Sequence, residues 1–93
     1  MEISEMPIIS HFYGILIYIY KETGGRHNMP HFHAQYAEYE CVYDIEGNII
    51  EGILPKKQSK LVEAWCLLHN DELRAAWKAW NESGVIIKIE GLR

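Results

Sequence analysis

The first part of the chain contains two short apolar stretches that predict strands. Ile8–Phe12 and Ile15–Tyr20 are rich in isoleucine and tyrosine, and β-branched and aromatic side chains favour extended backbone. Gly14 separates the two stretches. Lys21–Pro30 holds two adjacent glycines, an asparagine and a proline, so we expect a loop there.

His31–Leu54 alternates between apolar and polar positions and predicts three consecutive strands joined by tight turns. A two-residue turn at Ala37-Glu38 would join the first two strands. It would place apolar or aromatic pairs on one face of the sheet, as a half-buried sheet requires. The expected pairs are Tyr36 with Tyr39, Ala34 with Cys41, and Phe32 with Tyr43.

The second turn of this region is expected at Gly47-Asn48, because both residues tolerate a positive φ. The pairs that follow are Ile50 with Ile45, Gly52 with Tyr43, and Leu54 with Cys41. Both hairpins then select the same apolar face. A one-residue bulge in the second hairpin would invert this arrangement.

Two helices are predicted after Pro55, each with apolar residues at i, i+3, i+4 and i+7. Asn70 is the expected N-cap of the second helix and Gly84 its C-cap. Val85–Glu90 alternates loosely and is expected to form a last, edge strand. The predicted stripes are Leu61, Ala64, Trp65 and Leu68, then Leu73, Ala76, Trp77 and Trp80.

These elements predict an α+β fold: an antiparallel β-sheet of about four to six strands with a two-helix hairpin packed on one face. We expect one domain over residues 1–93, since a second core would need roughly 50 more residues. Within it, residues 1–5 are expected to be flexible, the sheet to span 8–54 and the helices 57–83.

Composition narrows the class of protein without naming an activity. The apolar share of 48% is that of a globular chain. No apolar run reaches the ~18 residues of a membrane span, and no signal peptide is evident, so we expect a cytoplasmic protein without a membrane partner. Cys41 and Cys66 lack a metal or redox spacing and are expected to be reduced and buried.

The chemical signal is a histidine cluster, His27-x-x-x-His31-x-His33. On a strand, the last two histidines share a face, with Cα atoms ~6.6 Å apart. In the predicted register Asp44 lies opposite His31, and Glu51 pairs with Asp44. The face away from the helices would therefore collect histidines and carboxylates.

Three interpretations of this face stay open. A divalent transition metal such as zinc would take His27, His31, His33 and Glu51 as ligands. A metal-free acid–base centre, for example a hydrolytic one, would use His31 and His33 as catalytic residues oriented by Asp44. The third interpretation is a solvated polar face with ordinary cross-strand pairs.

Several blocks of the sequence resemble a known family. They are Met6-Pro7-Ile8-Ile9-Ser10, Phe12-Tyr13-Gly14-Ile15, Pro30-His31-Phe32-His33, Glu51-Gly52-Ile53-Leu54-Pro55 and the Trp-bearing helices. Together they are similar to the small bacterial family of unknown function numbered 4160. Members usually carry an acidic residue before the first histidine and two prolines before the second, where this chain has Arg26 and Met29. The resemblance implies a context of small two-gene cassettes and a toxin–antitoxin component.

Two classes of function follow as hypotheses. The first is a histidine-centred metal or acid–base site. The second is a non-enzymatic protein-interaction module, in which the edge strand at Val85–Glu90 adds to a small protein partner encoded nearby. A homodimer is a further option. The net charge of −4 disfavours nucleic acid as a partner.

Overall fold

A computed structural model describes residues 7–20 and 29–93 of the chain. His27, the predicted flexible residues 1–5 and most of the predicted loop Lys21–Pro30 lie outside the described residues.

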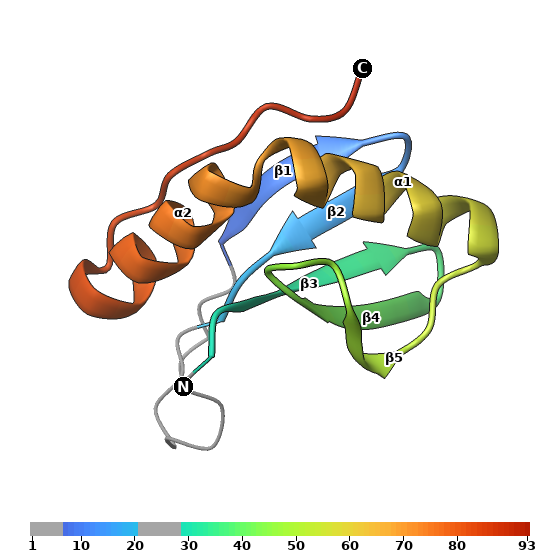
Figure 1. Cartoon of the computed structure of the whole chain (residues 1–93), viewed down its shortest axis with the longest axis horizontal. Coiled ribbons are helices and arrows are strands. Elements are labelled where there is room, and N and C mark those ends of the chain that lie inside the picture. The colour runs from blue at the N-terminus through green and yellow to red at the C-terminus, as the bar shows by residue number, and fades with distance from the viewer. Residues whose placement is uncertain (1–6, 21–28) are drawn as a thin grey trace.

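The described residues form a five-stranded antiparallel sheet followed by two helices, which confirms the predicted α+β class. The strands lie in the order in which they occur in the sequence, and the two helices cover one face of the sheet (Figure 1). The elements are β1 (Ile8–Phe12), β2 (Ile15–Tyr18), β3 (His31–Tyr36), β4 (Tyr39–Asp44), β5 (Ile49–Gly52), α1 (Lys56–Leu68) and α2 (Asn70–Ser83).

The β3–β4 hairpin has the predicted register. Tyr36 pairs with Tyr39, and Phe32 pairs with Tyr43, across the turn at residues 37 and 38. Ala37 adopts a positive φ of 53° in that turn. The aromatic rings of Phe32 and Tyr43 stack with centroids 5.3 Å apart on the face that the helices cover.

The β4–β5 hairpin differs from its prediction, because its turn is longer and its register shifts. Asp44 N donates to Asn48 O at 2.9 Å and Gly47 N to Asp44 O at 3.0 Å, so residues 45–47 make the turn. A shift between Val42 and Tyr43 then pairs Glu51 with Val42. The predicted pairing of Glu51 with Asp44 is therefore wrong, because the longer turn places Asn48 opposite Asp44 and moves the whole ladder. The shift between Val42 and Tyr43 then changes the register by one further residue.

The helix stripes are correct for α2 and displaced for α1. In α2, Leu73, Ala76 and Trp80 are buried and Trp77 is half-buried. In α1 only Trp65 of the predicted stripe is buried. The buried side chains of α1 are Ser59, Val62, Trp65 and Cys66, and Leu61 of the predicted stripe packs half-buried against the core.

The residues that cap the helices agree only in part with those predicted from the sequence. Gly84 ends α2 in the left-handed conformation with φ 67°, as predicted. His69, not Asn70, takes the N-cap position of α2, without a side-chain capping bond. The Asn70 amide instead donates from Nδ2 to Ile45 O at 2.7 Å, which ties the helix junction to the turn before β5.

The segment after α2 contains neither helix nor strand, where an edge strand had been predicted over Val85–Glu90. It nevertheless lies against β1, because Ile89 N donates to Ile9 O at 2.7 Å (Figure 1). Trp65 Nε1 donates to Glu90 O at 2.9 Å and holds the same segment over the core. This C-terminal segment therefore covers the outer edge of β1.

Both cysteines are free and buried, as predicted. Burial raises the pKa of the Cys66 thiol to about 11, and it also raises the pKa of Cys41. Both thiols are therefore packing groups, held in the protonated form at neutral pH. In the described part of the chain, no helix has the length and hydropathy that crossing a bilayer would require.

Candidate functional site

His31 and His33 alternate along β3 with the core residues Phe32 and Ala34, and their ring centroids lie 5.5 Å apart. His33 sits among aromatic side chains: it stacks on Tyr18 with centroids 5.2 Å apart and meets Tyr20 edge-on at 4.4 Å. Only 9% of His33 is exposed. The prediction that these two histidines share a face is confirmed, but their surroundings are aromatic and largely buried.

His31 is buried as well, and its ring is engaged locally. His31 Nδ1 lies 3.0 Å from the carbonyl oxygen of Met29, and the ring centroid lies 6.4 Å from that of Trp77 in α2. The backbone and an indole ring therefore set the position of this imidazole.

The two carboxylates predicted to join the histidines have other positions. Asp44 accepts hydrogen bonds from Asn48 N at 2.8 Å and from Asn48 Nδ2 at 3.2 Å, so its carboxylate stabilises the turn before β5. Glu51 lies beside Val42 because of the register shift. Neither carboxylate makes a hydrogen bond or ion pair to His31 or His33 within the described residues.

No group of three or more His, Cys, Asp or Glu side chains that could hold a metal ion exists within residues 7–20 and 29–93. The function predicted from the sequence, a metal-binding or hydrolytic centre built on His27, His31 and His33, is therefore wrong as stated. The physical reason is that the turn before β5 engages the Asp44 carboxylate and places Glu51 beside Val42, while His27 lies outside the described residues.

The carboxylate that does meet His33 is Glu40, which the sequence reasoning missed. Tyr18 donates its hydroxyl hydrogen bond to Glu40 Oε2, and His33 Nδ1 lies 3.6 Å from the same oxygen. Glu40 stands diagonally across the β3–β4 ladder from His33, opposite Gln35. The pairing of Tyr18 with His33 in β2–β3 completes the group. The register of β2 against β3 is the feature from which this group could have been predicted.

The Tyr18 hydroxyl offers a test of this arrangement. Burial, and next the hydrogen bond with the Glu40 carboxylate, raise the pKa of Tyr18 well above its ordinary value of 10.0. Above pH 10 the unfolded chain therefore releases a proton that the folded protein retains, and stability falls as pH rises. We expect the stability advantage of the wild type over Tyr18→Phe to shrink by roughly 1 kcal/mol between pH 8 and pH 11.

Urea denaturation at each pH measures this difference in the free energy of unfolding. A difference that stays constant from pH 8 to pH 11 would show that Tyr18 ionises equally in the folded and unfolded states.

Beside this group lies a shallow pocket of about 260 Å³ at the β5 side of the sheet. Glu51 and Gly52 from β5 line it together with His33, Glu40 and Val42. Two of its five lining residues are glutamates. The pocket therefore opens next to the last strand of the sheet and presents negative charge there.

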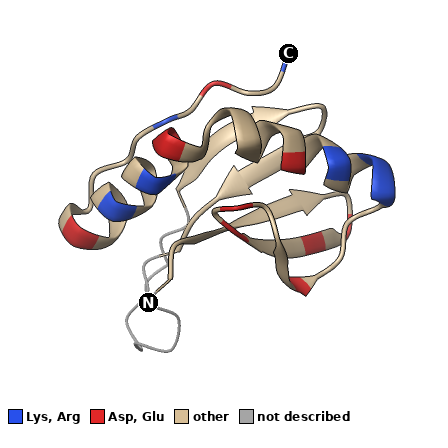
Figure 2. Cartoon of the chain, viewed as in Figure 1, with Lys and Arg blue, Asp and Glu red and all other residues tan. Residues whose placement is uncertain are grey.

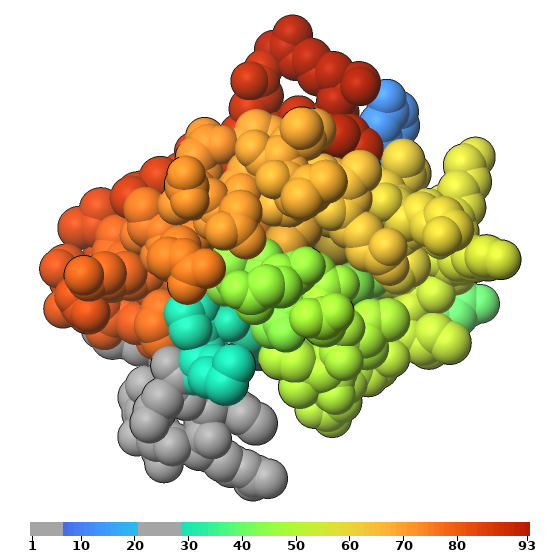
Figure 3. Space-filling view, in the orientation of Figure 1, coloured from blue at the N-terminus to red at the C-terminus, as the bar shows by residue number. Residues whose placement is uncertain are grey.

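β5 is also the open edge of the sheet, since within the described residues it pairs with β4 alone. Its residues are all exposed, and Ile49, Ile50 and the following Ile53 are exposed by 49%, 48% and 66%. Figure 3 shows this part of the chain, in light green, at the molecular surface. We call Ile49–Ile53 the β5 edge.

Charge is distributed unequally around the β5 edge. The strands carry acidic residues, whereas the lysines of the first turns of α1 lie on the helix layer (Figure 2). In the part of the chain that the structure describes, neither Glu40 nor Glu51 has a lysine or arginine nitrogen within 4.0 Å. The sheet side of the β5 edge is therefore acidic and lacks an internal counter-cation.

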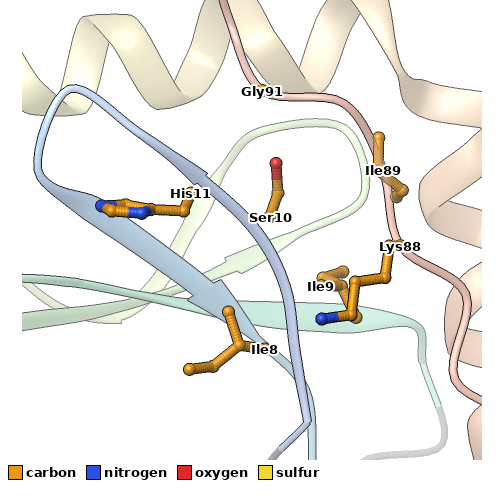
Figure 4. Close-up of a pocket in the computed structure, with 7 residues that line it drawn as sticks. All are labelled: Ile8, Ile9, Ser10, His11, Lys88, Ile89 and Gly91. Atoms are coloured by element: carbon orange, nitrogen blue, oxygen red, sulfur yellow. The ribbon is translucent and has the colours of Figure 1, made fainter.

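A second groove, of about 240 Å³, lies between β1 and the C-terminal segment. Figure 4 shows Lys88 reaching back toward β1 beside Ile9, the Ser10 hydroxyl pointing toward the segment near Gly91, and the His11 ring turned away. Its polar groups do not converge on one point, and isoleucine side chains form much of its wall. This groove is the seam along which the C-terminal segment packs.

Comparison with known proteins places one family model on this chain: a domain of unknown function (DUF4160) matches residues 14–78. That span includes β2 to β5, α1 and residues 70–78 of α2. No curated protein and no solved structure matches the chain. The family description states no activity, so it lends no support to a toxin–antitoxin role or to a metal site.

Proposed function

The chain belongs to the DUF4160 family of domains of unknown function, and from that premise we propose that it binds an extended segment of another protein by strand addition at the β5 edge. The observation that carries this proposal is an edge strand that pairs on one side only within residues 7–20 and 29–93, and whose exposed side chains include Ile49 and Ile50. The cytoplasmic location and a partner encoded nearby stay predictions.

An unpaired edge presents a row of backbone N–H and C=O groups that can pair with another chain. Proteins usually protect such edges with short strands, bulges, lysine, proline or a covering segment. β5 has only four residues and a register shift beside it, but residues 49–53 contain no lysine and no proline. At the opposite side of the sheet, β1 is covered by the C-terminal segment through the Ile89–Ile9 hydrogen bond. The contrast supports β5 as the edge at which a partner adds.

The charge of the β5 edge favours a different protein over a second copy. Two copies paired through β5 would bring Glu51 of one copy near the same acidic strand of the other, and like charges across strands destabilise pairing. The exposed isoleucines would still gain from burial, at about 25 cal/mol per Å² of apolar surface. A partner segment therefore needs apolar side chains without added negative charge.

The probe for this proposal is a capped, uncharged peptide of alternating threonine and valine, which favours an extended conformation. We expect saturable binding, with slowed amide hydrogen exchange at β5 and unchanged exchange at β1. Ile50→Lys should weaken binding at least about tenfold, because it introduces a charge at an edge that would otherwise be covered.

The matched control is Leu67→Lys, which makes the same change at an exposed leucine of α1. Equal weakening by both variants, or protection that appears away from β5, would overturn the proposal. A free protein that is dimeric by sizing, with its β5 amides protected, would identify the occupant as a second copy and would also overturn it.

A further inference from the structure

We infer that the segment accepted at the β5 edge is basic, with a lysine or arginine placed beside Glu51 and apolar residues alternating with it. This inference rests on the proposed strand addition and specifies its partner. The edge itself provides the docking surface, and the acidic pocket next to it selects the charge of the occupant.

The two carboxylates line one pocket on the face of the sheet that Glu51 shares with a residue opposite it on an added strand. A neighbouring strand lies ~4.8 Å from β5, and a residue opposite Glu51 on the same face would have its Cβ about 5 Å from that of Glu51. Glu51 lies beside Val42, and both line the pocket with Glu40. A long cationic side chain opposite Glu51 could therefore extend over the pocket toward Glu40.

The Glu40 carboxylate is held in place before any partner arrives. Tyr18 donates to its Oε2 atom, and His33 Nδ1 lies 3.6 Å from that same atom. Its Oε1 atom makes no hydrogen bond within residues 7–20 and 29–93. An oriented carboxylate with one oxygen available loses little side-chain entropy when it accepts a cation.

The alternation of the partner follows from the two faces of β5. Glu51 pairs with Val42 on the face that carries the pocket, whereas its neighbour Gly52 pairs with the core residue Cys41. The register shift between Val42 and Tyr43 places Ile49 opposite Tyr43, another core residue. Successive residues of an added strand also point to opposite faces. Basic residues therefore suit positions on the Glu51 side, and apolar residues suit those that meet exposed isoleucine.

The experiment compares three capped peptides of equal length, with valine alternating with lysine, threonine or glutamate. At low salt we expect the lysine peptide to bind about tenfold tighter than the threonine peptide, and the glutamate peptide to bind weakest. The preference should fall as salt rises from 25 to 300 mM, because exposed charges are screened. Dissociation constants come from calorimetry, and amide exchange locates each peptide.

Glu51→Lys should remove the preference for lysine and favour the glutamate peptide instead. The control Glu82→Lys changes net charge equally at an exposed position of α2, and it should leave the order of the three peptides unchanged. If both variants change the order equally, overall charge and not the pocket selects the peptide, and the inference is overturned.

The peptide experiment distinguishes a failure of the basic-partner inference from a failure of strand addition itself. If the threonine and lysine peptides bind equally and both protect β5 amides, strand addition stands and the basic partner is refuted. If no peptide protects β5 amides, the proposed function falls, and the inference falls with it.

Discussion

Replacing Gly52 by alanine should destabilise the fold by about 3 kcal/mol, a large share of the stability of a domain of this size. Gly52 has a φ of +85°, which side-chain-bearing residues rarely adopt. A Cβ added there would lie 2.3 Å from Glu40 O and 3.1 Å from Cys41 Cα. Both contacts are backbone atoms of β4, so relief would require separating β5 from its neighbour.

Gly84→Ala provides the matched control for this expectation. Gly84 also has a positive φ, +67°, but no atom lies within 4 Å of its added Cβ. Its replacement should cost only about 1 kcal/mol, the usual penalty for a left-handed non-glycine residue. Urea denaturation followed by circular dichroism compares the two variants. Equal losses would mean that β5 does not approach Glu40 as closely as the structure has it.

The same close approach connects stability with the proposed binding surface. Ile53 N donates to Glu40 O at 3.1 Å, so the residue after Gly52 is bonded to the residue whose side chain faces the pocket. Loss of this contact would move the β5 edge and the Glu40 carboxylate apart. Gly52→Ala should therefore weaken peptide binding in the molecules that remain folded.

The sequence predicted the β3–β4 register because a two-residue turn and a run of apolar pairs agree on it. Only one register places Phe32, Ala34 and Tyr36 opposite apolar partners across Ala37-Glu38. The β4–β5 register had no such support. Several turn lengths fit around Gly47, and the Asp44 carboxylate stabilises the longer turn by accepting two hydrogen bonds from Asn48. These two hydrogen bonds form in the folded turn, so the sequence pattern alone does not reveal them.

The candidate site, too, could be predicted only in part from the sequence. Strand periodicity is enough to place His31 and His33 on one face. What surrounds His33 comes from β2, whose register against β3 cannot be read from a tight turn, because residues 19–30 separate the two strands. Tyr18 and Glu40 therefore could not be assigned to the site from local spacing. The open edge was likewise expected at Val85–Glu90, but the C-terminal segment packs on β1 and leaves β5 exposed.

Trp65→Ala should be the most destabilising substitution in the helices, at about 4 kcal/mol. Trp65 is fully buried, with ring centroids 5.3 Å from Phe12 and 5.7 Å from Phe32. Its loss leaves a cavity between α1 and the sheet. It also removes the donor to Glu90 O, which helps to hold the C-terminal segment on the core. Circular dichroism measures this loss during denaturation without using tryptophan fluorescence.

Two smaller substitutions in α1 decide between the observed and the predicted helix faces. Val62 is fully buried although the predicted stripe omitted it, whereas Leu68 belonged to that stripe and is 67% exposed. Val62→Ala should cost about 2 kcal/mol, and Leu68→Ala less than about 0.5 kcal/mol. The reverse order would mean that α1 turns toward the sheet the face that its i, i+3, i+4, i+7 pattern predicts. The expected order would instead confirm that Val62 lies on the core side of α1 with Cys66 and with Trp65, whose ring meets that of Phe32.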